Sequence, residues 1–228
     1  GSDALKRANE WTAQRFRDYG LANVHLESWS IAHAWRRGWA RARIVAPAEH
    51  RLAAEVAGWS PNTPGPVRGP LVYVKAEKKE DLEPYRGKLR GALVITSEPQ
   101  PRQRAEERPL QPRPPQPERD FAVLRRLAQE REDFFAQEGV VGLLRDSDKS
   151  FGLFNMSSVG RDYQPAKLPT AFLTPESYDL LWRLRKNEQP VTVEFEIAGG
   201  EFSAGPVEVY NTVAEIPGSE KPDEVVIL

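Results

Sequence analysis

The chain has 228 residues, enough for one large domain or two small ones with a hydrophobic core. Its 32 basic and 33 acidic residues give a net charge of −1, so composition offers no electrostatic reason to expect nucleic acid or an anionic membrane as a partner. The sequence contains no cysteine, which excludes disulfides and a cysteine nucleophile, and no apolar run near the roughly 20 residues that span a membrane.

The first predicted element is a helix over residues 3–19. Ser2 or Asp3 can cap its N-terminus, and Gly20 lies where a left-handed residue commonly ends a helix. Side chains recur at three- and four-residue spacing on one face, at Leu5, Ala8, Thr12, Phe16 and Tyr19. Strand-like stretches follow at 23–31, 38–45, 51–58, 71–76 and 92–96.

The segment Glu98–Arg119 holds seven prolines and almost no apolar side chains. Such a segment buries too little apolar surface to offset the conformational entropy that it would lose on folding. We therefore expect an exposed, proline-rich loop over residues 98–119.

A second helix is predicted from a cap at Asp120 to about Gln137, with Gly139 ending it and a short buried strand at 140–144. The side chains expected to face inward are Phe121, Leu124, Leu127, Ala128 and Phe134. The remaining elements are a strand at 168–173, a helix from the cap Thr174 to about Asn187, and strands at 191–197, 207–216 and 225–228.

Known catalytic motifs are missing from the sequence: it has no Gly-x-Ser-x-Gly elbow, no phosphate-binding glycine loop and no His-Glu-x-x-His helix. His25 and Glu27 would share one face of a strand and could begin a metal site. Zinc, however, needs three or four converging ligands, and His33 and His50 lie at no recognisable spacing from this pair. An exposed strand face is the favoured interpretation.

Two further patterns are weak. The stretch 146–150 hints at a calcium loop, but Phe151 stands where that loop requires glycine and Ser157 where it requires a bidentate glutamate. A solvated turn is the better interpretation. The prolines at 112–117 have the spacing of a ligand for an aromatic groove, which arises easily in any proline-rich loop.

Two stretches near the C-terminal end carry a family resemblance: YNTVAEIPGS at 210–219 and KPDEVVIL at 221–228. They resemble a segment of the di-zinc exopeptidases, the aminopeptidases and carboxypeptidases related to glutamate carboxypeptidase. In that family the segment forms two strands of the catalytic sheet, and a Gly-Gly-His-x-Asp-Ser motif with the first zinc ligand follows. The helix at 3–19 resembles the first helix of the same catalytic domain.

The central part of the chain resembles the protease-associated domain that is often inserted at this point of the family. The residues that carry this resemblance are LVYV at 71–74, YRGKLRGALV at 85–94, GVVGL at 139–143 and LPTAFL at 168–173.

The resemblance implies an α+β fold: a β-rich protease-associated domain with accompanying helices, plus fragments of an α/β zinc-exopeptidase domain at both ends. The expected divisions are 1–43 for the N-terminal peptidase fragment, 44–205 for the protease-associated domain, and 206–228 for the start of the peptidase sheet, truncated before the zinc-ligand motif. It also implies two zinc ions and an exported location for the parent enzyme, but transfers no catalytic, cofactor-binding or metal-binding residue to this chain.

A non-catalytic inserted domain of this kind would shape substrate access to a neighbouring active site or mediate protein contacts. Loops on a rigid sheet are the expected contact surface, for a peptide substrate or the remainder of the peptidase domain. The residues predicted to make such contacts are Asp146, Asp148, Asn155, Arg161 and Tyr163.

Two other functions stay open at this point. The chain could be a stand-alone protein- or peptide-binding module whose sheet ends at Leu228, or a hydrolase whose nucleophile and base are unrecognised. The wholly aliphatic strand at 225–228 argues against the first alternative, because an exposed aliphatic edge strand favours pairing between chains and natural proteins usually avoid it. We therefore expect self-association through this strand.

Overall fold

The computed structural model describes residues 2–99, 120–220 and Glu224, with Phe121 described only by its backbone. The expectations of a loop over 100–119 and a strand over 225–228 lie outside these residues. The chain forms two compact units. The first comprises residues 1–36, 162–164 and 202–228, and the second comprises 37–161 and 165–201. The mixed α+β fold expected from the sequence is confirmed.

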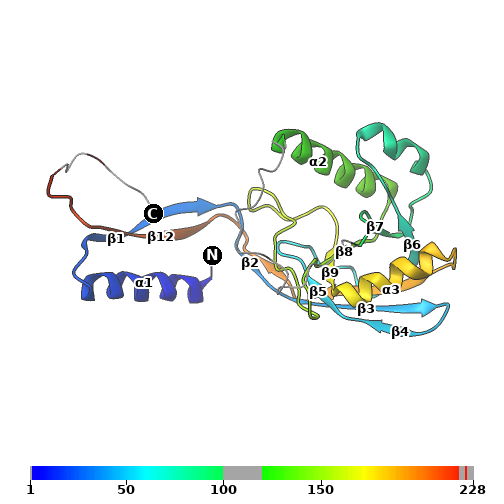
Figure 1. Ribbon diagram of the computed structural model, residues 1–228, viewed down its shortest axis with the longest axis horizontal. Helices are drawn as coiled ribbons and strands as arrows, with labels where there is room; N and C mark the ends of the chain where they lie inside the picture. Colours follow the sequence, from blue (N-terminus) through cyan, green and yellow to red (C-terminus); the bar gives the residue numbers. More distant parts are fainter. Residues whose placement is uncertain (1, 100–119, 221–223, 225–228) are drawn as a thin grey trace. The chain divides into compact units, whose positions relative to one another are not determined.

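The first unit joins the two ends of the described chain. Strands β1 (Ala22–Ile31) and β12 (Val207–Glu215) pair antiparallel, and helix α1 (Asp3–Asp18) packs against them (Figure 1). The Asn9 side chain of α1 donates a hydrogen bond to the Tyr210 carbonyl at 2.8 Å, and the Thr212 hydroxyl donates one to the Asn9 carbonyl at 3.2 Å. Segments near the two ends of the described chain therefore lie side by side.

The inner face of α1 differs from the predicted one. Leu5 and Tyr19, expected to face inward, are 49% and 74% exposed, whereas Ala13 is buried. The helix rests on a sheet of only two strands, so it has too little surface beneath it to cover the whole apolar stripe. Its ends follow the sequence closely: Ser2 Oγ accepts from the Leu5 amide, and Gly20 has a left-handed φ of 80°.

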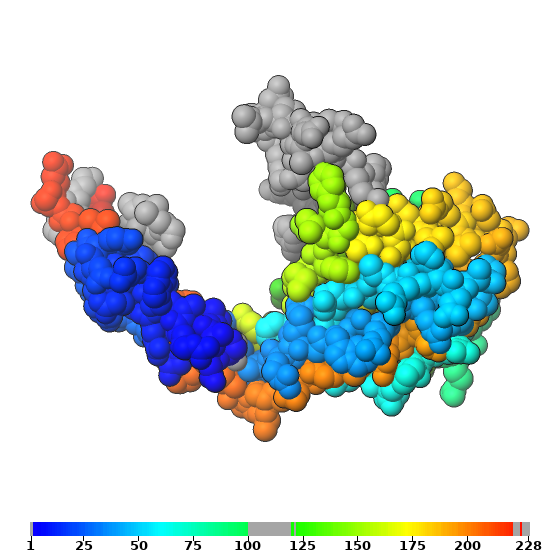
Figure 2. Space-filling view, turned by 90° about the horizontal axis from the view of Figure 1, so that it is seen from below, coloured from blue at the N-terminus to red at the C-terminus, as the bar shows by residue number. Residues whose placement is uncertain are grey.

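The second unit contains one eight-stranded sheet in the order β4-β3-β10-β6-β7-β8-β9-β5. Strands β4, β3, β10 and β6 are antiparallel neighbours, β6 to β9 run parallel, and β5 pairs antiparallel with β9. Figure 2 shows β3, β4 and β10 side by side on one face of this unit. The strands are β3 (Trp39–Ala46), β4 (His50–Leu52), β5 (Ala54–Val56), β6 (Val67–Tyr73), β7 (Leu93–Ile95), β8 (Gly142–Asp146), β9 (Thr170–Leu173) and β10 (Thr192–Ala198).

Short elements complete the described chain. A 3₁₀ helix, η1 (Lys79–Tyr85), which the sequence analysis did not predict, follows β6. Strands β2 (Trp35–Arg36) and β11 (Glu201–Phe202) form a two-stranded pair. The expected domain boundary between residues 43 and 44 falls inside β3, and β3 lies wholly in the second unit because it pairs with β10 along its length.

Two helices lie on opposite faces of the parallel strands, α2 (Phe121–Glu138) on one and α3 (Pro175–Lys186) on the other (Figure 1). Both begin at the predicted caps. Asp120 Oδ1 accepts from two backbone amides of the first turn of α2, at 3.0 and 3.1 Å, and Thr174 caps α3. Gly139 ends α2 with a left-handed φ of 77°.

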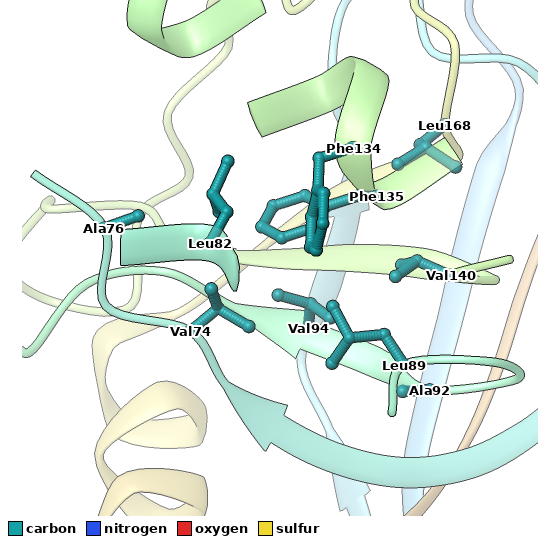
Figure 3. Packing of buried hydrophobic residues seen from close by; sticks show 10 residues of the cluster. All are labelled: Val74, Ala76, Leu82, Leu89, Ala92, Val94, Phe134, Phe135, Val140 and Leu168. Carbon is teal, nitrogen blue, oxygen red and sulfur yellow. The ribbon is translucent and has the colours of Figure 1, made fainter. Parts of the chain in front are cut away.

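The main core of the second unit lies between α2, η1 and the parallel strands. Figure 3 shows Phe134 and Phe135 of α2 pointing at Val94 and Val140 of the sheet layer. Leu124, predicted to face inward, is 47% exposed, whereas the buried side chains of α2 are Phe134 and Phe135 in its C-terminal half. The buried members of this cluster are Val74, Ala76, Leu82, Leu89, Ala92, Val94, Phe134, Phe135, Val140 and Leu168.

Truncating Phe135 should destabilise the protein strongly. Its side chain is 2% exposed, so Phe135→Ala leaves a cavity in the core and is expected to cost about 3–5 kcal/mol of unfolding free energy. Phe151→Ala is the matched control, since Phe151 is 80% exposed and its truncation should change stability by less than about 0.5 kcal/mol. Urea denaturation of both variants measures the difference. Equal effects would contradict this assignment of the core.

Candidate functional site

The predicted contact residues Asp146 and Asp148 form a tight turn at the end of β8. Asp146 Oδ1 accepts a hydrogen bond from the Asp148 amide at 3.0 Å, and Asp148 has a positive φ of 52°. Between them Ser147 is fully buried, where its amide donates to the Leu173 carbonyl and its hydroxyl to the Leu153 carbonyl. This hydrogen bonding anchors the turn to the sheet, and the stretch is a turn, as the sequence analysis favoured.

The Asn155 side chain likewise forms a hydrogen bond with the nearby backbone. Its Oδ1 accepts from the Ser157 amide at 2.9 Å, which closes a local turn. The next residues are tied to Gly58, which donates its amide to the Ser157 carbonyl and accepts from the Val159 amide. The 155–160 segment is therefore held by backbone hydrogen bonds to another part of the second unit.

The remaining two predicted contact residues fall in different units. Arg161 belongs to the second unit, where its Nη1 donates to the Arg125 carbonyl of α2 at 3.0 Å. Tyr163 belongs to the first unit and meets the Trp29 ring edge-on, with ring centroids 5.4 Å apart. Arg161 also lines a cavity of the second unit. A contact role for the five residues stays a prediction.

That cavity is the candidate binding site of the second unit. It lies between α2 and the parallel strands and has a volume of about 120 Å³. Its wall is largely apolar, with three arginines: Arg131 from α2, Arg145 from β8 and Arg161. Sequence reasoning missed the first two of them.

A sequence signal for both missed arginines exists. Arg131 lies four residues before Phe135 and three before Phe134, which places it on the inner face of α2. Arg145 lies two residues after Leu143 and so projects from the same face of β8. A basic residue at an inward position of both a helix and a neighbouring strand is the pattern that could have indicated the cavity.

The exposed side of the antiparallel strands carries a carboxylate whose pKa is strongly lowered. Glu194 of β10 accepts hydrogen bonds from Arg43 and Arg68, each at 2.7 Å, and these two bonds lower its pKa to about 2. Arg43 also pairs with Glu49. The carboxylate is held by its two neighbours on adjacent strands, and we assign it a structural role across β3, β10 and β6.

The three histidines do not converge. His25 lies on the exposed face of β1, with Nδ1 2.7 Å from the Asn23 carbonyl, which confirms the favoured interpretation of the His25–Glu27 pair. His33 Nδ1 lies 2.9 Å from the Ser203 carbonyl, and His50 lies in β4. Across the described ranges, no three histidine, aspartate or glutamate side chains are grouped as a metal site requires. Those residues therefore do not fit a zinc centre, and no catalytic step can be derived from them.

No described helix is both long and apolar enough to cross a membrane.

Solved structures define the class of protein that this fold resembles. A peptidase M28 precursor from Shewanella amazonensis matches 99% of this chain and 48% of its own, with a TM-score of 0.70 and 25% identity. An aminopeptidase from Aneurinibacillus sp. strain AM-1 matches 97% of this chain and 45% of its own, with a TM-score of 0.59 and 18% identity. A zinc aminopeptidase from Bacillus subtilis matches 96% and 42%, with a TM-score of 0.50 and 11% identity. The last two show a shared fold alone.

Sequence comparison then points to a particular relative. Carboxypeptidase Q from Bos taurus is 30% identical over 232 residues, and the protein of that name from Rattus norvegicus is 29% identical over 230 residues. The alignments cover 100% of this chain but 44% of each relative, so the chain spans less than half of their length. No protein-family model matches the chain. The chain is thus homologous to part of carboxypeptidase Q and shares the fold of M28 peptidase structures.

Neutralising Glu194 should change stability in a pH-dependent way. Its pKa falls from 4.5 to about 2 on folding, so its contribution is complete above pH 4.5 and is lost as the pH falls through about 2. We expect Glu194→Gln to melt at a lower temperature than the unmodified protein at pH 7, with the difference shrinking between pH 4.5 and about 2.

Glu196→Gln provides the control for this measurement, since Glu196 lies two residues along the same strand and forms no ion pair with any described residue. Thermal unfolding followed by circular dichroism across the pH range gives both curves. A Glu194→Gln difference that persists unchanged at low pH would contradict the role of the ion pair.

Proposed function

We propose that this chain is the part of a zinc exopeptidase that carries an inserted, non-catalytic protease-associated domain, which forms the second unit. The observation that carries the proposal is the alignment of the entire chain with 44% of carboxypeptidase Q. The Gly-Gly-His-x-Asp-Ser motif that the family resemblance associates with the first zinc ligand does not occur among the 228 residues. The two zinc ions belong, in this proposal, to the parent enzyme, which we also propose to be exported.

The division into units supports this arrangement. The first unit is built from residues near both ends of the sequence, and the second from a long intervening stretch. A domain inserted into another produces this pattern, because the host must be completed by chain on both sides of the insertion. The first unit would be the peptidase fragment and the second the accessory domain.

The accessory domain would act by limiting which chain ends reach the active site or by contacting other proteins. Interactions made away from the scissile bond can raise turnover when they are stronger in the transition state. Exposed apolar side chains in the turn after β8 suit such contacts, since Phe151, Leu153 and Met156 are 80%, 60% and 54% exposed. The alternative function, a stand-alone peptide-binding module, would use the same surface.

The chain alone should not hydrolyse peptides. With no zinc-ligand motif in its sequence, it lacks the means to activate a metal-bound water. We expect no zinc-dependent turnover of aminoacyl or peptidyl chromogenic substrates, measured with and without added zinc and with a chelator as control. Hydrolysis that survives repurification and disappears with the chelator would overturn the proposal. Binding of peptides by calorimetry in the absence of turnover would favour the peptide-binding module.

The first unit should associate with other protein surface. Each strand of its two-stranded sheet has an outer edge with no described neighbour, and Trp11 and Ile216 are 65% and 84% exposed. We propose that this surface contacts the remainder of a peptidase domain and that, without it, the chain self-associates.

Light scattering over a range of concentrations should therefore show a rise in mean mass that Trp11→Glu reduces. Phe151→Glu is the matched control, because it places the same charge at an exposed aromatic of the second unit. Mean mass independent of concentration, or an equal reduction by both variants, would contradict association through the first unit.

A further inference from the structure

The cavity under α2 combines a small volume with an unusual charge arrangement. Arg131, Arg145 and Arg161 reach it from a helix, a strand and a loop, and all belong to the second unit. At about 120 Å³ it has room for a small molecule, given that one water molecule occupies roughly 30 Å³ in the liquid. The apolar part of its wall includes Val94, Phe135 and Val159.

Arg131 is the member of this cluster that responds to the other two arginines. The pKa of Arg131 is lowered, first by burial and then by the charges of Arg145 and Arg161. Burial also lowers the pKa of Arg145, although much of this residue's surface is exposed. Arg145 is therefore both accessible to solvent and partly desolvated by the protein around it.

One acidic side chain lines the cavity with the three arginines, and it forms no ion pair with any of them. Within the part of the chain that the structure describes, no aspartate or glutamate forms an ion pair with any of the three arginines. Glu132 also lines the cavity, but its Oε1 accepts a hydrogen bond from the Lys167 amide at 2.6 Å. With three arginines and one glutamate in its lining, the cavity carries a net positive charge next to a partly apolar wall, and an anion that joined the arginines would offset it.

The remaining contacts of the arginines leave donors available. Arg161 uses Nη1 for the Arg125 carbonyl, and its other N–H groups make no described hydrogen bond. Arg145 lies over the Phe172 ring, 5.6 Å from its centroid, and such stacking involves the flat face of the guanidinium rather than its N–H edge. The planar fork of an arginine matches the two oxygens of a carboxylate.

We propose that this cavity binds the carboxylate group of a small organic acid, with Arg131, Arg145 and Arg161 contacting its oxygens and the apolar wall contacting its carbon atoms. The apolar wall favours an organic acid over an inorganic anion, whose whole surface is hydrated. The inference concerns the second unit alone and does not depend on the proposed relation to a peptidase.

Isothermal titration calorimetry at constant ionic strength tests the proposal, with acetate and isobutyrate as organic acids and inorganic phosphate as the comparison anion. Both acids should bind, and Arg131→Gln should weaken binding at least about tenfold, the effect of losing one charged hydrogen bond. Arg126→Gln is the matched control: it removes the same charge from an exposed position of the same helix and should leave affinity unchanged.

Melting temperatures separate loss of binding from loss of folding. Without ligand, Arg131→Gln should melt no lower than the unmodified protein, because it removes one of three mutually repelling charges. With acetate, only the unmodified protein and Arg126→Gln should gain stability. Arg145→Gln offers an independent second variant.

Absence of acid binding at about 100 mM, where a site with a Kd near 1 mM would be almost full, would overturn the proposal. Binding of phosphate alone, or equal weakening by Arg126→Gln, would also overturn it.

Discussion

The second unit depends on one strand, β6, that changes partners halfway along its length. Residues Val67–Pro70 pair antiparallel with β10, and Leu71–Tyr73 pair parallel with β7. Where the change occurs, a Cβ on Gly69 would lie only 1.9 Å from the Gly91 carbonyl oxygen. The antiparallel and parallel halves of the sheet can therefore meet only around a residue without a side chain. The arginine cavity lies in the parallel half of the sheet and the ion pair of Glu194 in the antiparallel half.

The two halves of the sheet use charge differently. In the antiparallel half, Glu194 is matched by Arg43 and Arg68 on adjacent strands, so opposite charges satisfy one another across the ladder. In the parallel half, Arg131 and Arg145 line a shared cavity and form no ion pair with any described acid, although Glu132 lines the same cavity. Ion pairs between strands, such as those of Glu194, indicate a structural role. Several arginines around one cavity instead indicate a site for an anionic ligand.

Much of the fold was predictable because its signals are local. The caps Asp120 and Thr174 act on amides within three residues, and the alternation over 191–197 follows directly from the geometry of a strand. The exposed positions Leu5 and Leu124 were mispredicted because helical periodicity gives the direction of a side chain but not the extent of the surface beneath it. That extent is set by tertiary packing.

The candidate site was less predictable for the same reason. Polarity and loop position drew attention to Asp146 and Asn155, whose side chains prove to satisfy nearby backbone amides. The arginine cavity joins a helix to a strand and to Arg161, and sequence spacing alone does not reveal that three such elements meet. The resemblance to the exopeptidase family indicated the class of protein better than the site, because it rests on stretches of several residues, such as 210–219, rather than on single side chains.

The pairing of β1 with β12 has a consequence for how such a protein can change over time. Ile31 and Val207 are direct partners, so the two strands of this ladder stay within about 5 Å of each other at the point where the intervening chain departs and returns. A tight reverse turn could bridge that gap without disturbing the register of the strands. The segment that connects Ile31 to Val207 could therefore be shortened, lengthened or replaced in evolution while β1 and β12 keep their hydrogen bonds.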